Sequence, residues 1–253
     1  MKSLIESELR RIESKYGVRV LYAVESGSRA WGFASKDSDY DVRFLYVHPL
    51  AWYLSVEQQR DVIEEPIRND LDLSGWDLRK ALGLLRKSNP PLLEWLNSPV
   101  VYFQDDAFLG DFRRLASEHY QPEKVFLHYL HMAEGNFRSY LREEIVWIKK
   151  YFYVLRPILA CRWIERGLGV VPMEFGRLAH GTLEDPTLRF SIADLVVRKQ
   201  AGEELDRGPR IPAISDFIEA ELPRLALSAP IKGDLPPVTP LNSFFRNTLQ
   251  QAA

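Results

Sequence analysis

The sequence is poor in cysteine: Cys161 is the only one in 253 residues. A single cysteine cannot form an intrachain disulfide or a multi-cysteine zinc site. No apolar run approaches the roughly 20 residues that a membrane-spanning helix needs. The N-terminal segment MKSLIESELRRIESKYG is charged and amphipathic, which is not typical of a signal peptide. These absences predict a chain without membrane segments and with a cytoplasmic location.

The chain also lacks an excess of either charge. It has 33 Lys and Arg residues against 35 Asp and Glu residues, a net charge of −2. Any nucleic-acid partner must therefore be held by a local basic patch. Hydrophobic residues make up 46%, and neither an internal repeat nor a low-complexity tract is visible, so the composition is that of a folded protein.

The residue patterns predict a mixed first domain, residues 1–118. An amphipathic helix ends at Gly17, and Asp77 is expected to cap the N-terminus of another helix. Four segments have strand patterns: 18–24, 41–47, 61–64 and 69–74. We therefore expect an α+β fold for this part, with helices alongside a mixed sheet.

From Gln121 onward the patterns are helical, which predicts a second, all-helical domain over residues 119–253. The segment 125–165 is long and aromatic, and Pro157 is expected to kink it or divide it into two helices. The tail at 228–240 contains four prolines and is expected to lack regular structure. The oligomeric state is not indicated by any of these patterns.

The segment with the clearest chemical meaning is ESGSRAWGFASKDSDYDVRFLYV, residues 25–47. Asp39 and Asp41 lie two positions apart at the start of an apolar strand, so they project from the same face. Packing gives no reason to place two like charges there, whereas Mg²⁺ is bound by carboxylates together with phosphate oxygens. Gly27 and Ser28 then form a natural phosphate-binding turn. A solvated turn is the simpler explanation for Asp39, but it does not explain Asp41, because a strand has begun there.

A third carboxylate would complete such a site, and Asp72 is the candidate. It lies between two leucines in a predicted strand, which is costly unless it is paired or bound to a metal. Asp70 shares its face and competes for the role. Arg43 lies on the same strand face as Asp39 and Asp41, and we expect it to neutralise those carboxylates when metal is absent.

The spacing of these motifs resembles the DNA polymerase β-like nucleotidyltransferase superfamily. Three wider segments in order resemble its RlaP-like or YcgL-like branch, which is associated with RNA repair: GSRAWGFASKDSDYDVRFLYV, GWDLRKALGLLRKSNPPLLEWL and NFRSYLREEIVWIKKYFYVLRPILACRW. The resemblance covers the chain up to about Trp163. It implies a nucleotidyltransferase that uses two Mg²⁺ or Mn²⁺ ions and a nucleoside triphosphate (NTP), with the active site in a cleft between two domains.

The resemblance also implies a role for each motif residue. Gly27 and Ser28 match the turn that holds the triphosphate, and Asp39 and Asp41 match the pair that binds both metal ions. Asp72 matches the carboxylate that binds the catalytic metal and helps to deprotonate the attacking hydroxyl. Arg29 directly follows the turn, where it either contacts a phosphate or is an exposed cation.

In the helical half, cations alternate with aromatic residues. Lys149, Tyr153 and Arg156 fall on one helix face, and Lys150 lies beside them. Because second-domain helices of this superfamily supply cations for the triphosphate and an aromatic ring for the base, we expect these four residues to bind the nucleotide. The alternative is a partly solvated face with extended Lys side chains. Two further candidates for substrate contact are Arg138 and Arg142.

The acceptor stays open at this point. The RNA-repair association favours an RNA or tRNA end that receives a nucleoside monophosphate (NMP), with release of pyrophosphate. A protein side chain is the next alternative, as in nucleotidylylating (AMPylator-like) enzymes, and a small molecule is the third. A different class of function is a non-catalytic, nucleotide-binding regulatory module. The filled acidic positions argue against that last alternative.

Overall fold

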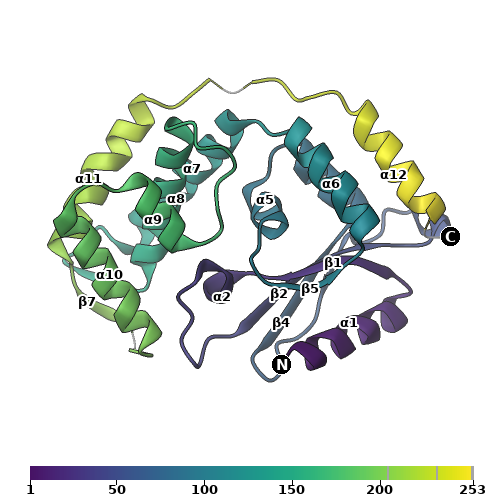
Figure 1. The fold of residues 1–253 in the computed structure, drawn as a ribbon, viewed down its shortest axis with the longest axis horizontal. Coiled ribbons are helices and arrows are strands. Elements are labelled where there is room, and N and C mark those ends of the chain that lie inside the picture. Colours follow the sequence, from purple (N-terminus) through teal and green to yellow (C-terminus); the bar gives the residue numbers. More distant parts are fainter. Residues whose placement is uncertain (204, 232, 252–253) are drawn as a thin grey trace. The chain divides into compact units, whose positions relative to one another are not determined.

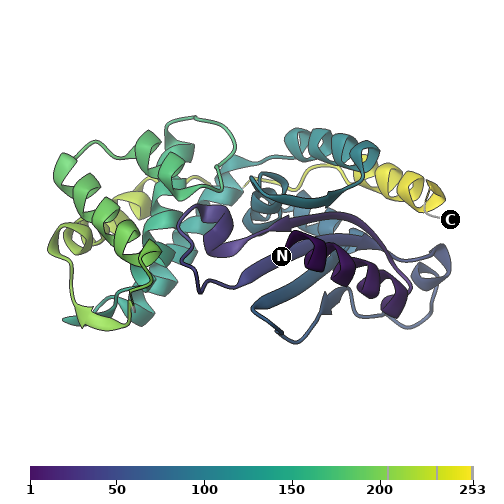
Figure 2. The same ribbon diagram turned by 60° about the horizontal axis from the view of Figure 1, so that its bottom comes forward.

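The computed structural model describes residues 1–203, 205–231 and 233–251, which form two compact units. The first unit comprises Met1–Ala30, Asp39–Tyr120 and the described residues from Asp234 onward. The second comprises Trp31–Ser38 and Gln121–Gly233. Figures 1 and 2 show the elements of each unit.

The first unit is a five-stranded sheet with helices on both faces. Its strands are β1 (Arg19–Glu25), β2 (Tyr40–Val47), β3 (Val62–Glu64), β4 (Leu71–Asp77) and β5 (Val101–Gln104). They lie in the order β3-β4-β2-β1-β5, with β2 and β4 parallel and the other pairs antiparallel. Its helices are α1 (Lys2–Tyr16), α2 (Gly27–Trp31, whose last residue clusters with the second unit), α3 (Leu50–Tyr53), α4 (Leu78–Arg86), α5 (Pro90–Leu96), α6 (Asp106–Glu118) and α12 (Thr239–Gln251). This is the expected α+β class.

Alternation along β2 and β4 separates an apolar face from a polar one. Helix α1 buries Ile5, Leu9 and Ile12 on the face that carries Val42 and Phe44. Helices α5 and α6 lie on the opposite side of the sheet (Figure 1). Because successive strand residues point to opposite faces, the charged residues between these apolar positions share the α5 side.

Several predicted boundaries are confirmed and others shift. Gly17 ends α1 in the left-handed conformation (φ 60°), and the Asp77 side chain caps α4 by accepting from the Arg79 amide. Strand β4 begins at Leu71 rather than at residue 69, because Asn69 and Asp70 have positive φ angles of 50° and 59° and form a turn.

The C-terminal helix belongs to the first unit, although the expected domain boundary at 118/119 placed it in the second. Helix α12, which follows the proline-containing tail, packs against α4 and α6 of the first unit (Figure 1). Phe244 lies 5.6 Å from the ring of Phe108, and Phe245 lies 5.0 Å from the ring of Tyr53. These aromatic contacts hold the end of the chain on the first unit, although its position in sequence suggested the helical one.

The second unit is helical apart from a two-stranded ribbon. Its helices are α7 (Pro122–Tyr140), α8 (Lys150–Glu165), α9 (Phe175–Thr182), α10 (Pro186–Gln200) and α11 (Pro212–Leu227), and the ribbon pairs β6 (Ile145–Trp147) with β7 (Arg207–Pro209). Pro157 lies inside α8, so the long helical segment is divided at 141–149 and not at the proline. Within the described part of the chain, no helix combines the length and the low polarity that crossing a bilayer requires.

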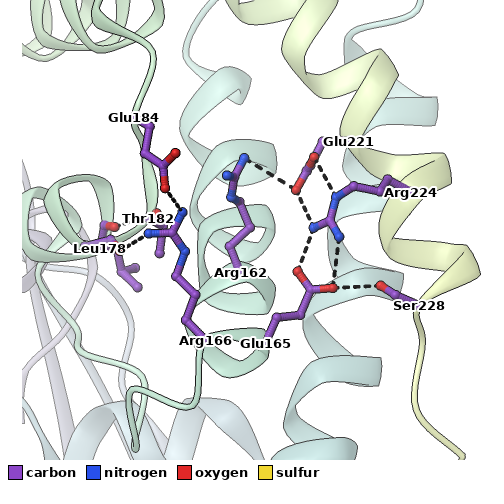
Figure 3. Close-up of polar contacts among 10 residues, drawn as sticks. Arg162, Glu165, Arg166, Leu178, Thr182, Glu184, Glu221, Arg224 and Ser228 are labelled. Carbon is purple, nitrogen blue, oxygen red and sulfur yellow. Dashed lines mark hydrogen bonds and ion pairs between the residues drawn. The ribbon is translucent and has the colours of Figure 1, made fainter.

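Two features hold the second unit together. Phe33, from the segment Trp31–Ser38, stacks on Phe152 of α8 with ring centroids 4.4 Å apart. Arg224 of α11 binds Glu165 of α8, with its Nη2 atom 2.6 Å from Oε2, and it also binds Glu221 (Figure 3). The ring stacking anchors the segment Trp31–Ser38 to this unit by an apolar contact. The Arg224–Glu165 ion pair links α11 to α8.

Candidate active site

Two of the predicted carboxylates meet across neighbouring strands. Asp41 of β2 and Asp72 of β4 are direct register partners in the parallel pair. The Nη2 atom of Arg43 lies 3.0 Å from Asp41 Oδ1 and 2.8 Å from Asp72 Oδ2. The predicted neutralising role of Arg43 is therefore present as two ion pairs. A cation already bridges both acids, which is the arrangement that a divalent metal would require.

Asp70 takes no part in this arrangement. It occupies the left-handed turn before β4, is exposed, and its carbonyl accepts a hydrogen bond from the Tyr40 amide at 2.7 Å. The side chain of Asp72, by contrast, is only 29% exposed and faces Arg43. The geometry thus favours Asp72 over Asp70 as the partner of Asp41.

Asp39 is near this pair but does not close a ligand set with it. Its side chain is exposed, and its carbonyl accepts a hydrogen bond from Arg29 Nε at 3.1 Å. Among the residues that the structure describes, no group of three or more His, Cys, Asp and Glu side chains is arranged to hold a metal ion. Asp41 and Asp72 supply a converging pair of oxygen donors, both within reach of Arg43.

The electrostatics of Asp41 nevertheless favour a cation. Burial is the largest influence and raises the pKa of the Asp41 carboxyl above its ordinary value; Arg43 opposes this shift, whereas the charges of Asp72 and Asp39 add to it. Such crowding of negative charge in a half-buried position is relieved by binding a positive ion. The hard oxygen donors at Asp41 and Asp72 fit Mg²⁺ or Mn²⁺.

Gly27 lies directly against the Asp41 carboxylate. Its φ angle is +55°, and a Cβ atom built on it would lie 1.9 Å from Asp41 Oδ2. The backbone of the Gly-Ser turn can approach the carboxylate this closely only because the residue has no side chain. The Ser26 amide donates to the Asp41 carbonyl at 2.8 Å, and Ser28 is half-buried beside them. The backbone at Ser26 and Gly27 and the Asp41 residue are therefore in direct contact.

The Arg29 side chain stacks on an aromatic ring of the neighbouring strand. Its guanidinium carbon lies 3.7 Å from the centroid of the Tyr40 ring, and Tyr40 stands between Asp39 and Asp41. Stacking on an aromatic ring holds a guanidinium in a defined place. Arg29 is thus a positioned cation stacked on Tyr40, whose side chain packs on the Val42 face of the strand, opposite to Asp41.

Glu25 was not singled out by its sequence pattern, and it is the most deeply buried acid beside the site. It is 1% exposed at the end of β1, and burial, the largest influence, raises the pKa of its carboxyl. Its carboxylate accepts hydrogen bonds from the Asp41 amide at 2.8 Å and from the Tyr102 hydroxyl. The sequence did contain a sign of this role, because Glu25 is an acidic residue at the end of a strand that is otherwise mostly apolar.

The nucleotide-binding candidates of the second unit occupy different environments. Lys149 is exposed at the N-terminus of α8, and Lys150 lies with Nζ 4.5 Å from the ring centroids of both Tyr140 and Tyr153. Arg156 is only 4% exposed, with Nη2 3.4 Å from the Met173 carbonyl. The predicted single face therefore runs from solvent at Lys149 into the interior at Arg156.

A further cation joins this group and was missed. Lys199 of α10 lies with Nζ 3.5 Å from the Ser35 hydroxyl. Burial, followed by the charge of Lys149, lowers the pKa of Lys199, whereas Asp37 opposes the shift. The two lysines are 50 residues apart in sequence, so no local pattern connects them. Together they form a positive cluster in the second unit.

In the first unit, a carboxylate pair on parallel strands thus lies beside a glycine whose backbone approaches it closely. A family model described as "RNA repair pathway DNA polymerase beta family", RlaP, matches residues 1–247. The chain is also 51% identical to the uncharacterized protein YcgL of Bacillus subtilis (strain 168), over 99% of this chain and 97% of that protein. The chain therefore belongs to the RlaP family of polymerase β-like nucleotidyltransferases.

A solved structure is also similar to this chain. A nucleotidyltransferase-like protein from Exiguobacterium sibiricum 255-15, known from a crystal structure at 1.90 Å resolution, matches with 15% identity and a TM-score of 0.35. The match covers 96% of this chain and 80% of that one.

Proposed function

We propose that the protein transfers an NMP from an NTP to a hydroxyl group, with Mg²⁺ or Mn²⁺, and releases pyrophosphate. The observation that carries the proposal is the pairing of Asp41 with Asp72 against the Gly27 turn, in a chain of the RlaP family. The first acceptor to test is an RNA or tRNA end, as the description of the family suggests. We also propose that the protein acts in the cytoplasm.

In this proposal each residue of the first unit has a defined task. Asp41 and Asp72, with Asp39 as the third predicted ligand, would hold the metal ions, which when bound would lower the pKa of the acceptor hydroxyl and neutralise the triphosphate. Gly27 and Ser28 bind the triphosphate through backbone amides and a hydroxyl, and Arg29 adds a positive charge. A metal ion held by Asp41 and Asp72 would compete with Arg43, which now binds an oxygen of each.

The transfer step follows from these tasks. The acceptor oxygen attacks the α-phosphorus, the bond from that phosphorus to the oxygen bridging to the β-phosphorus breaks, and pyrophosphate leaves with the bonding electrons. The hydroxyl proton passes to Asp72. Positioning and charge neutralisation supply most of the acceleration in such phosphoryl-type transfers. For the second unit, the proposal is that Lys149, Lys150, Tyr153 and Arg156 contact the nucleotide.

The decisive test is to incubate the protein with each α-labelled NTP, Mg²⁺ or Mn²⁺, and either total RNA or total protein. We expect pyrophosphate release and label in the RNA. Label in protein would instead identify a nucleotidylylating enzyme. Nucleotide binding without any pyrophosphate release would contradict the enzyme proposal and favour a regulatory module.

A pair of matched variants tests the site. Asp72→Asn should abolish transfer, because it removes a metal ligand and the proton acceptor. Asp70→Asn changes a neighbouring exposed acid in a turn conformation that asparagine tolerates, so it should retain transfer. Equal activity of the two variants would show that the carboxylate assignment is wrong.

A further inference from the structure

The buried carboxylate of Glu25 has a place in the site that no motif assigns. An acid that is 1% exposed is costly to bury unless its oxygens are hydrogen-bonded. Both oxygens are satisfied: Oε1 accepts from the Asp41 amide at 2.8 Å, and Oε2 accepts from the Tyr102 hydroxyl. Because neither oxygen faces solvent, Glu25 is not itself placed to bind a metal or a phosphate.

The main chain of Glu25 is equally well held. Its amide donates to the Val100 carbonyl at 3.0 Å, and its carbonyl accepts from the Ser98 hydroxyl at 2.6 Å. The segment 98–102 therefore forms hydrogen bonds with the amide, the carbonyl and the side chain of Glu25. A side chain anchored at so many points is a rigid support for whatever it binds.

What Glu25 binds is the main chain of Asp41. The β1–β2 ladder ends at the pair Glu25 and Val42, so the Asp41 amide has no further strand residue opposite it. The Glu25 carboxylate supplies the missing acceptor, while the Ser26 amide donates to the Asp41 carbonyl at 2.8 Å. Consecutive residues of one segment thus hold both polar groups of the Asp41 main chain.

We propose that Glu25 is a positioning residue that fixes the Asp41 main chain, so that the Asp41 carboxylate is held beside Asp72 and against Gly27, ready to bind the cation. This inference rests on the proposed function, since it concerns the same metal site. Because Gly27 approaches the Asp41 carboxylate so closely, a small shift of the Asp41 main chain would bring the carboxylate into collision with Gly27 or move it away. Groups that orient a metal ligand in this way strongly affect metal affinity.

The test is Mn²⁺ binding, followed by electron paramagnetic resonance of the free ion, in the wild type and three variants. Glu25→Met removes the acceptor and should weaken Mn²⁺ affinity about tenfold or more, as loss of a ligand-orienting group does. Glu25→Gln keeps Oε1 as an acceptor for the Asp41 amide and should restore most of the affinity. Tyr102→Phe removes one hydrogen bond to Glu25 and should weaken binding by about threefold.

Asp77→Asn is the matched control. Asp77 is also a fully buried acid of this unit, accepting from the Tyr53 hydroxyl and the Arg79 amide, but it is the last residue of β4 and pairs in register with Tyr46, not with Asp41. It should lower thermal stability without changing Mn²⁺ affinity. A purely structural role for Glu25 would make its variants behave like Asp77→Asn.

Unchanged Mn²⁺ affinity in folded Glu25→Met would overturn the inference. If that variant does not fold, unchanged affinity in Tyr102→Phe overturns it instead. Failure of the proposed function looks different: the wild type would bind Mn²⁺ and respond to these substitutions, yet transfer no nucleotide to any acceptor. The transfer assay and the binding assay therefore fail separately.

Discussion

Asp41 and Asp72 face each other as register partners on parallel strands, and one nitrogen of Arg43 lies within 3.0 Å of an oxygen of each. The guanidinium thus holds together two carboxylates that would otherwise repel one another. A bound divalent cation would perform the same task with twice the charge. The competition between Arg43 and a metal is open to direct measurement.

We expect Arg43→Met to lower the free energy of unfolding by about 1–3 kcal/mol without metal, because two half-buried carboxylates lose their shared donor. Mg²⁺ should then stabilise the variant more than the wild type. Urea unfolding with and without Mg²⁺ measures both effects. Arg60→Met is the control, since Arg60 and its partner Glu64 are 69% and 58% exposed and such surface pairs contribute less than about 1 kcal/mol. Equal Mg²⁺ effects in all three proteins would contradict a metal site at Arg43.

Gly27→Ala should be far more damaging than Gly17→Ala. Both glycines have φ near +60°, so each substitution carries a similar backbone cost of about 1–2 kcal/mol. A Cβ at Gly17 meets nothing within 4 Å, whereas at Gly27 it lies 1.9 Å from Asp41 Oδ2. The extra loss of stability at Gly27 should be about 1–3 kcal/mol, as for other overpacked positions. Thermal unfolding gives the comparison, and Mn²⁺ affinity should fall only in Gly27→Ala.

Stability should also fall at acidic pH through Glu65. Burial raises the pKa of this carboxyl, but hydrogen bonds from Lys15, Tyr16 and Arg11 outweigh it and lower the pKa from 4.5 to about 2. A lowered folded-state pKa means that the contribution is complete above about pH 4.5 and is lost as the pH falls toward 2. The contribution should be on the order of 2 kcal/mol, after allowance for the exposure of Lys15 and Arg11.

Urea unfolding of the wild type and Glu65→Gln across this pH range measures that contribution. The difference between them should be constant above about pH 5.5 and shrink toward pH 2. Lys15→Met removes one hydrogen bond that lowers the folded-state pKa of Glu65, so the acid-dependent loss should be smaller and should end at a higher pH. A constant difference between wild type and Glu65→Gln down to pH 2 would contradict the assignment.

In the second unit, Arg224 of α11 binds Glu165 of α8 and also Glu221 of its own helix, as Figure 3 shows. Because the Glu221 side chain is only 9% exposed, Arg224→Met should cost about 1–3 kcal/mol by leaving a buried acid with a weaker partner. Arg114→Met is the matched control. Arg114 also binds two acids, yet all three side chains are at least 50% exposed, so its loss should cost less than about 1 kcal/mol. Equal losses in calorimetry would show that burial at Glu221 is unimportant.

Local patterns were sufficient for part of this protein. The strand that follows Asp39, the end of α1 at Gly17 and the Asp77 cap depend on alternation and on capping, which act over a few residues. The α+β class followed from the same periodicities. The placement of Pro157 was harder, because a proline is compatible with a helix when packing holds the turns around it.

Contacts between distant residues were decided only by the tertiary structure. Asp41 meets Asp72 because β2 and β4 pair in parallel, although neither residue indicates the register by itself. Glu25 binds the Asp41 amide because the β1–β2 ladder ends there, and α12 returns to the first unit because its aromatic residues find partners on Phe108 and Tyr53. The sequence by itself determined which groups carry charge and which segments become strands or helices. That Asp41 and Asp72 both come within 3.0 Å of the Arg43 guanidinium depends on strand register and long-range packing, which are properties of the whole folded unit.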